Sequence, residues 1–336
     1  MSPGFQTKGL RSVLRRLGFA AVGATALSVS LGFSTSAQAT SPAWTQLTPT
    51  TSPLARYVGD QMAYDAATRN VVLFGGYGGG FLGDTWTWNG TNWTHLSPKT
   101  SPAQRDNASM AYDPASKKIL LFGGNSNGSP ITDTWTWNGT TWTKLSPKGS
   151  PSPRFAASIA YDPASKKVLL FGGDDNGHFV SDTWTWNGTT WTNLSPKKSP
   201  SPRAWASMSY DSATGQMVLF GGYGGGYLSD TWTWNGTTWT KLSPKKSPSS
   251  RSAASMTYDP TTATLLLFGG DNHTTSTEFG DTWTWSGTTW TKLSPSKSPS
   301  PRDGAGLAYD QRTGNVVLFG GEQTPTSDLA DTWKWG

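Results

Sequence analysis

The sequence contains no cysteine, only three histidines and only two glutamates, and charged residues make up 14% of its 336 positions. The absence of cysteine excludes disulfides and thiolate metal sites, so the fold must be stabilised by packing. The histidines show no recognisable metal-ligand spacing. Long helical patterns are absent as well, whereas Gly, Trp and Thr are abundant, a composition typical of β-structure with many turns.

Residues 18–33 form an apolar run that follows four basic residues and no acidic one. The run is short for a membrane span, and small residues follow it at Ala37 and Ala39. This pattern predicts a signal peptide at residues 1–39 in preference to a membrane anchor. We therefore expect a secreted mature chain without a membrane span. A pair of adjacent arginines leaves the general and the twin-arginine export routes both open.

The expected signal peptide also accounts for most of the net charge. The whole chain carries a formal charge of +6, and removal of the four basic residues before position 40 leaves +2. Bulk charge therefore gives little support to nucleic-acid binding, and we expect no nucleic-acid partner.

A repeat of about 49 residues fills the rest of the chain. Each copy contains Tyr-Asp, then Leu-Phe-Gly-Gly, then Asp-Thr-Trp. The six Tyr-Asp pairs begin at Tyr64, Tyr112, Tyr161, Tyr210, Tyr258 and Tyr309. Six copies of the same motifs predict six copies of the same structural unit.

Each unit is expected to contain four short strands, named a to d. In the third unit they cover residues 157–161, 168–173, 182–186 and 189–194. Asp162-Pro163 predicts a turn between a and b, and Asn187-Gly188 predicts a two-residue type I′ turn between c and d. Tandem four-stranded antiparallel units of this length predict an all-β fold, a six-bladed β-propeller. The sixth unit lacks a strand d, and residues 43–49 match that pattern, so we expect the N-terminal strand to complete the last blade and close the ring.

The order of these motifs resembles the kelch repeat, in which a strand ending in LFGG is followed by a loop, a Trp-bearing strand, a Gly turn and a second Trp. Over residues 40–336 the sequence is most similar to bacterial kelch proteins and to the central domain of galactose-oxidase-like proteins. The resemblance implies a propeller and says little about activity. Copper enzymes of the second group use a tyrosine crosslinked to cysteine, which this chain cannot form.

Tryptophan occurs three times in every blade. This pattern accounts for 18 of the 19 tryptophans and predicts packing between blades. Trp205 lies outside the pattern and is the better binding candidate. Asn-Gly-Thr fits both an N-glycosylation acceptor and a hairpin turn, and we favour the turn. It occurs at Asn89, Asn138, Asn187 and Asn235.

An arginine precedes every strand a, and an aspartate opens every strand c. The arginines are Arg56, Arg105, Arg154, Arg203, Arg251 and Arg302. Six arginines around one mouth of the channel would suit an anionic ligand. Because both residue types recur in every blade and start on the same face, structural Arg–Asp pairs are the favoured interpretation.

The b-to-c and d-to-a connections share that face, which we call the loop face. The b-to-c loops are where the blades differ, and variable loops on a regular scaffold usually carry function. The candidate ligand-binding residues are Trp205, Tyr57, Phe155, Tyr77, Tyr223, Asp106, Asp303, His178, His273, Glu278 and Glu322, together with Arg154 and Arg203. The alternative is that they are ordinary solvated loop residues. Lysines in the d-to-a connections lie on the same face and suggest an acidic ligand.

The sequence therefore predicts a secreted, monomeric binding module for an extracellular glycan or protein, with no cofactor, no metal and no catalytic residue. Two alternatives stay open. One is a sugar-modifying enzyme of the mutarotase or epimerase kind at the same mouth, which the arginine ring and Glu322 would permit. The other is a structural scaffold without a small ligand.

Overall fold

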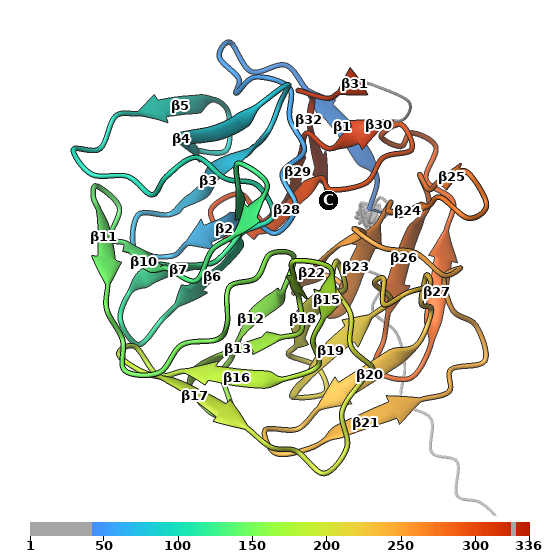
Figure 1. The fold of residues 1–336 in the computed structure, drawn as a ribbon. Coiled ribbons are helices and arrows are strands. Elements are labelled where there is room, and N and C mark those ends of the chain that lie inside the picture. Colours follow the sequence, from blue (N-terminus) through green and yellow to red (C-terminus); the bar gives the residue numbers. More distant parts are fainter. Residues whose placement is uncertain (1–41, 324–326) are drawn as a thin grey trace, which may run out of the picture. The chain divides into compact units, whose positions relative to one another are not determined.

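The computed structural model describes residues 42–323 and 327–336, and within them every regular element is a β-strand. Six four-stranded antiparallel sheets stand as blades around a central channel (Figure 1). This confirms the all-β, six-bladed propeller. No helix in this part of the chain is long and apolar enough to cross a membrane. The expected signal peptide at residues 1–39 lies outside the described residues.

Each blade runs from strand a at the channel to strand d at the rim. Blade 1 contains β2 (Met62–Asp65), β3 (Asn70–Tyr77), β4 (Phe81–Trp88) and β5 (Trp93–Leu96). Blade 2 contains β6 (Ser109–Asp113), β7 (Lys118–Phe122), β10 (Thr134–Trp137) and β11 (Trp142–Leu145). Blade 3 contains β12 (Ser158–Asp162), β13 (Lys167–Phe171), β16 (Thr183–Trp186) and β17 (Trp191–Leu194).

The other three blades follow the same order. Blade 4 contains β18 (Ser207–Asp211), β19 (Gln216–Phe220), β20 (Thr231–Trp234) and β21 (Trp239–Leu242). Blade 5 contains β22 (Ser255–Asp259), β23 (Thr264–Phe268), β26 (Thr282–Trp285) and β27 (Trp290–Leu293). Blade 6 contains β28 (Gly306–Asp310), β29 (Asn315–Phe319), β32 (Thr332–Trp335) and β1 (Trp44–Leu47).

Four b-to-c loops contain an additional short hairpin, whose strands are two residues long and which the sequence analysis did not predict. These hairpins pair β8 (Asn125–Ser126) with β9 (Ser129–Pro130), β14 (Asp174–Asp175) with β15 (His178–Phe179), β24 (Asp271–Asn272) with β25 (Thr277–Glu278), and β30 (Glu322–Gln323) with β31 (Ser327–Asp328).

The N-terminal strand closes the ring. Strand β1 pairs with β32 in an antiparallel register that places Trp44 opposite Trp335 and Leu47 opposite Thr332. The outermost strand of the last blade thus comes from the beginning of the described chain, as the sequence predicted. This pairing ties the two ends of the ring together.

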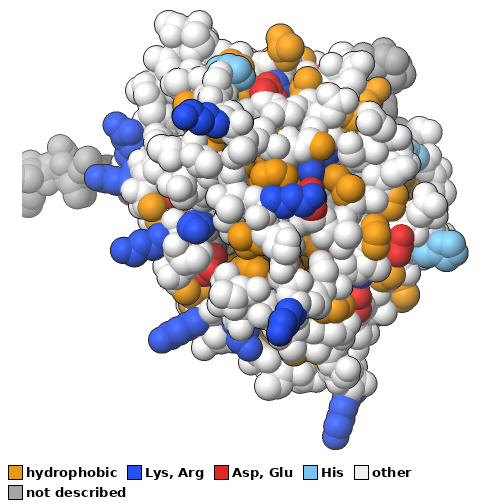
Figure 2. All heavy atoms as spheres, turned by 60° about the vertical axis from the view of Figure 1, so that its left-hand side comes forward, with side chains coloured by type: hydrophobic (Ala, Val, Ile, Leu, Met, Phe, Trp, Pro, Cys, Tyr) orange, Lys and Arg blue, Asp and Glu red, His pale blue; other side chains and the backbone are white. Residues whose placement is uncertain are grey.

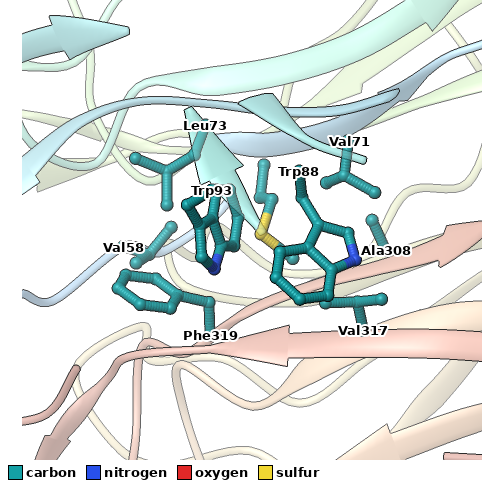
Figure 3. Close-up of a cluster of buried hydrophobic side chains, with 9 residues drawn as sticks. Val58, Val71, Leu73, Trp88, Trp93, Ala308, Val317 and Phe319 are labelled. Atoms are coloured by element: carbon teal, nitrogen blue, oxygen red, sulfur yellow. The ribbon is translucent and has the colours of Figure 1, made fainter. Parts of the chain in front are cut away.

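Tryptophans join neighbouring blades, as predicted. Figure 3 shows Trp88 and Trp93 of blade 1 packed with Val317 and Phe319 of blade 6. The indole nitrogen of Trp93 also donates to Thr332 Oγ1 at 3.0 Å, and such a bond recurs at every junction. The other five run from Trp142 to Thr85, Trp191 to Thr134, Trp239 to Thr183, Trp290 to Thr231 and Trp44 to Thr282. Two of each blade's three tryptophans are therefore buried and committed to packing.

The predicted type I′ turn between strands c and d is wrong. A type I′ turn needs positive φ at two residues, but only Gly188 has it, at 97°. Strand d begins at Trp191, so four residues form the connection. Asn187 Oδ1 instead accepts hydrogen bonds from the backbone amides of Thr189 and Thr190, at 3.0 and 2.9 Å. This Asx interaction holds Asn187 outside the left-handed region.

Candidate functional site

The loop face forms where each d-to-a connection pairs with a b-to-c loop. Single antiparallel bridges join Tyr57 to Tyr77, Asp106 to Asn125 and Asp303 to Glu322, and the other blades repeat them. The glycine pair that ends each strand b makes this approach possible. A Cβ on Gly172, for example, would lie 2.5 Å from the carbonyl oxygen of Arg203. The prediction that both kinds of connection share one face is confirmed.

The arginines and aspartates pair in all six blades, as favoured from the sequence. Arg203 Nη1 lies 2.6 Å from Asp230 Oδ1, and Nη2 lies 3.1 Å from Oδ2. Partial burial pushes the pKa of Asp230 upward, but the hydrogen bond and charge of Arg203 outweigh it and hold that pKa below the ordinary value. The side chains of Arg154 and Arg203 are at most 1% exposed. Both guanidinium groups are thus bound within the protein.

A cavity of about 720 Å³ opens on the loop face at the end of the channel. Eight of the predicted candidates line it: Tyr57, Tyr77, Asp106, Trp205, Tyr223, His273, Asp303 and Glu322. We call this cavity the loop-face pocket. It is of the size of small-molecule and peptide side-chain sites.

Trp205 crosses the channel inside this pocket. Its indole nitrogen donates to Asn107 Oδ1 at 3.0 Å, although Trp205 enters blade 4 and Asn107 enters blade 2. Phe155 packs edge-on against the indole, with ring centroids 5.5 Å apart. The indole therefore forms a fixed floor between the pocket and the channel below.

The backbone beneath Trp205 is a ring of left-handed residues. Trp205 has φ of 52°, and Asn107, Ala156, Ala253 and Gly304 have similar values. The amides of Ala156, Trp205, Ala253 and Gly304 donate to the ring carbonyl of the preceding blade, as from Trp205 to Ala156 at 3.0 Å and from Ala253 to Trp205 at 2.9 Å. Left-handed backbone is unfavourable for a bulky residue, and these hydrogen bonds offset that cost. They also fix the position from which the indole projects.

Carboxyl groups make the loop-face pocket acidic. Burial raises the pKa of Asp106 to about 6. Burial, with the nearby charges of Asp271 and Glu322, raises the pKa of Asp303 well above its usual value. Burial and neighbouring acids raise the pKa of Glu322 too. No lysine or arginine is among the described residues that line the pocket. The pocket lining gives the expectation of an acidic ligand no support, because the arginines are held in ion pairs and no connector lysine lines the pocket.

Aromatic rings and one histidine form the opposite wall. Tyr223 and Tyr227 pack edge to face, 5.0 Å between centroids. The Tyr227 hydroxyl donates to Asp271 Oδ2 at 3.1 Å, and His273 Nε2 lies 3.3 Å from the same oxygen. Asp271 also accepts from Ser252 Oγ at 2.6 Å. Asp106 differs. The side chains of Asn107 and Asn125 hydrogen-bond to its carboxyl group, but its buried Oδ1 accepts no hydrogen bond from the described residues.

The five remaining candidates do not line the pocket. Phe155 supports Trp205 from behind. His178 lies in β15 and Glu278 in β25, the outer strands of their loop hairpins. Arg154 and Arg203 lie beneath, in the ion pairs.

Sequence reasoning missed Asn107, Tyr227 and Asp271 as lining residues. The last two lie in loops that it had identified as variable. Asn107 occupies the same repeat position as Trp205, two residues after the arginine, and that position was the available signal. No group of three His, Cys, Asp or Glu side chains in residues 42–323 and 327–336 is arranged to hold a metal ion.

Basic side chains do not gather into one patch on the side of the propeller shown in Figure 2. Lys and Arg residues stand apart there, with uncharged surface between them. A nucleic-acid backbone requires a continuous basic surface, and this side does not offer one.

A family model described as the KLHDC2/KLHL20/DRC7 Kelch-repeats domain matches this sequence twice, over residues 34–192 and residues 138–284. The two overlapping matches cover most of the chain. No curated protein matches the sequence.

Proposed function

Because this chain belongs to the Kelch-repeat family, whose propellers are in general protein-interaction modules, we propose that it is an exported binding module whose ligand sits in the loop-face pocket. The partner that fits best is a segment of an extracellular protein that carries basic side chains. Export follows from the predicted signal peptide. A carbohydrate is the second candidate ligand.

The observation that carries this proposal is the combination of acidic groups and a missing donor. Asp106, Asp303 and Glu322 face a pocket whose described lining includes no lysine or arginine. Asp106 Oδ1 is buried without a donor, and a buried acceptor left unpaired is costly. An ammonium or guanidinium group from a partner would supply both the donor and the missing positive charge.

Aromatic side chains give the pocket a second means of recognition. Tyr57, Trp205 and Tyr223 line it together with the carboxyl groups. A lysine or arginine side chain gains cation–π energy on such rings, about 0.5–2 kcal/mol. The same rings favour a carbohydrate as the second candidate, since a sugar can stack on the indole while its hydroxyls donate to the carboxylates.

Two features would permit a sugar-modifying enzyme at this mouth, the arginine ring and Glu322, and one of them is not available. The arginine ring that would have permitted a sugar-modifying activity is bound in ion pairs. Glu322 remains, with a raised pKa.

A binding screen of the mature chain tests the proposal. The panel would contain basic, acidic and neutral extracellular peptides together with neutral polysaccharides. We expect retention of basic peptides, reduced in Trp205→Ala and unchanged in Leu54→Ala. Leu54 is a matched control because it is 71% exposed and does not line the pocket. Preferential retention of acidic peptides, or equal retention by both variants, would contradict the proposal.

A further inference from the structure

The opposite end of the channel holds a second cavity, of about 740 Å³. It opens on the face that carries the a-to-b turns, and we call it the turn-face cavity. Five tyrosines, the next-to-last residues of their strands a, surround it: Tyr64, Tyr161, Tyr210, Tyr258 and Tyr309. Deeper in the channel, methionines such as Met110 and Met208 add apolar walls. The repeat itself therefore builds an aromatic and apolar cup.

The turn-face cavity is separate from the loop-face pocket. Only a narrow space of about 20 Å³ connects them, and its lining includes Trp205, Ala156 and Gly304. That volume holds about one water molecule. A ligand in one cavity therefore does not occupy the other.

One carboxyl group interrupts the near-symmetry of the cup. The segment from the arginine to the Tyr-Asp pair is one residue longer in blade 1 than in the other five blades, and the extra length brings Asp60 into the channel. The backbone on either side is fixed. Gly59 N donates to Gly304 O at 2.8 Å, and Asp60 O accepts from Met110 N at 3.0 Å. Asp60 lines both the connecting space and the turn-face cavity.

Asp60 has no partner for its charge. No donor from the described residues reaches its carboxylate, and it is the one Asp, Glu, Lys, Arg or His among the described residues that line the turn-face cavity. Its side chain is exposed in the open cavity. The blades around the cavity still limit access of bulk water to the carboxylate, and this raises the pKa of Asp60 to about 7.

We propose that the turn-face cavity is a second ligand site, which takes a small organic amine with an apolar body. The ammonium group would donate to the Asp60 carboxylate, forming a charge-assisted hydrogen bond in a poorly solvated place. The apolar body would lie among the methionines, whose flexible side chains adapt to different shapes. Tyrosine rings at the mouth would add cation–π attraction. An anionic ligand is disfavoured by the charge of Asp60.

Three probes of similar shape test this site on the mature chain: 2-phenylethylamine, 2-phenylethanol and 3-phenylpropionate. Isothermal titration at about pH 8 keeps Asp60 ionised and the amine protonated. We expect saturable binding of the amine, with the alcohol and the acid at least about tenfold weaker. Failure of the amine to saturate, or equal binding of the alcohol, would overturn the proposal.

Two variants and one control variant assign the site. Asp60→Asn keeps the shape and removes the charge, so the amine should bind at least about tenfold more weakly. Met208→Trp fills the cup and should abolish binding, whereas Tyr223→Ala, which changes only the loop-face pocket, should leave it within about twofold. Unchanged amine binding in Asp60→Asn would overturn the assignment.

Acidification gives an independent readout. At about pH 5.5 Asp60 is protonated, since its pKa is about 7, and amine affinity should fall by roughly tenfold. The other titratable groups that line the cavity are the five tyrosines, whose pKa values are raised by burial and nearby aspartates, so they stay neutral. An affinity that does not change with pH would contradict the role of Asp60.

Discussion

The indole nitrogen of Trp205 donates a 3.0 Å hydrogen bond to Asn107 Oδ1 and so connects blade 4 to blade 2 across the channel. Blade 3 lies between these two blades and takes no part in the bond. Its Ala156 contributes only backbone hydrogen bonds to the ring of left-handed residues beneath the indole. Trp205 thereby lies between two cavities of similar volume, the acidic loop-face pocket and the turn-face cavity.

Asn107→Ala should weaken ligand binding in the loop-face pocket without unfolding the protein. The substitution removes the acceptor that fixes the indole, at a stability cost of about 1 kcal/mol. Trp205→Phe removes the donor and keeps an aromatic floor, so the two variants should have similar effects. Peptide-binding titrations with parallel thermal melts check this. Full affinity in Asn107→Ala would show that the cross-channel bond does not position the indole.

Asp230→Asn should destabilise the fold strongly, because it leaves the buried Arg203 guanidinium without a counter-charge. Breaking a buried pair costs about 3–5 kcal/mol, and the low end applies because Asp230 is 15% exposed. Urea denaturation at neutral pH measures the loss, with Asp175→Asn as the control outside the ion pairs. The pKa of Asp230 is lowered in the folded state, so the pair's contribution is lost below about pH 4. A midpoint equal to that of the control would contradict the structural role.

Trp44→Ala should open the junction between blades 5 and 6. Trp44 is 1% exposed, contacts Phe268 and donates to Thr282, so its truncation should cost about 3–5 kcal/mol. Thr45→Ala, on the exposed side of the same strand, should cost little. Removal of residues 42–47 should lower the melting temperature further, since it exposes an edge of β32. An unchanged melting temperature after that truncation would refute closure by the N-terminal strand.

Asp60→Asn should stabilise the protein at about pH 8 and make no difference at about pH 4. The pKa of Asp60 is raised from an ordinary 3.8 to about 7 in the folded state. Protonation therefore favours folding, and this contribution is lost as the pH rises through about 7. Asparagine keeps the neutral form at every pH. Thermal melts across this range measure the effect, and a lower melting temperature for Asp60→Asn at about pH 8 would contradict it.

The repeat explains why the fold and much of the loop face could be predicted. Residues that recur in all six copies are structural, and residues that occur in one copy are exceptional. The Arg–Asp pairs could therefore be predicted, and Trp205 could be recognised as lying outside the repeat pattern. The position of β1 was readable too, because its tryptophan-bearing pattern matched the missing strand d.

What the sequence could not provide is the sign of the pocket's charge and its contacts across the channel. Lysines and arginines are frequent near the loop face in sequence, but ion pairing removes the arginines and geometry keeps the lysines away. The bond from Trp205 to Asn107 joins residues 98 positions apart. The turn between strands c and d was mispredicted because the Asn side chain competes for the amides that a type I′ turn leaves free.

The most direct test of the central claim compares one basic peptide selected in the screen on three proteins: unsubstituted residues 40–336, Asp106→Asn and Leu54→Ala. Asp106 lines the acidic pocket and Leu54 does not. Because the pKa of Asp106 is about 6, its carboxylate is ionised at about pH 8. Titration at that pH should show affinity reduced by roughly tenfold in Asp106→Asn, as expected for loss of a charge-assisted contact, and unchanged in Leu54→Ala. Equal affinity for all three proteins would contradict ligand binding in the loop-face pocket.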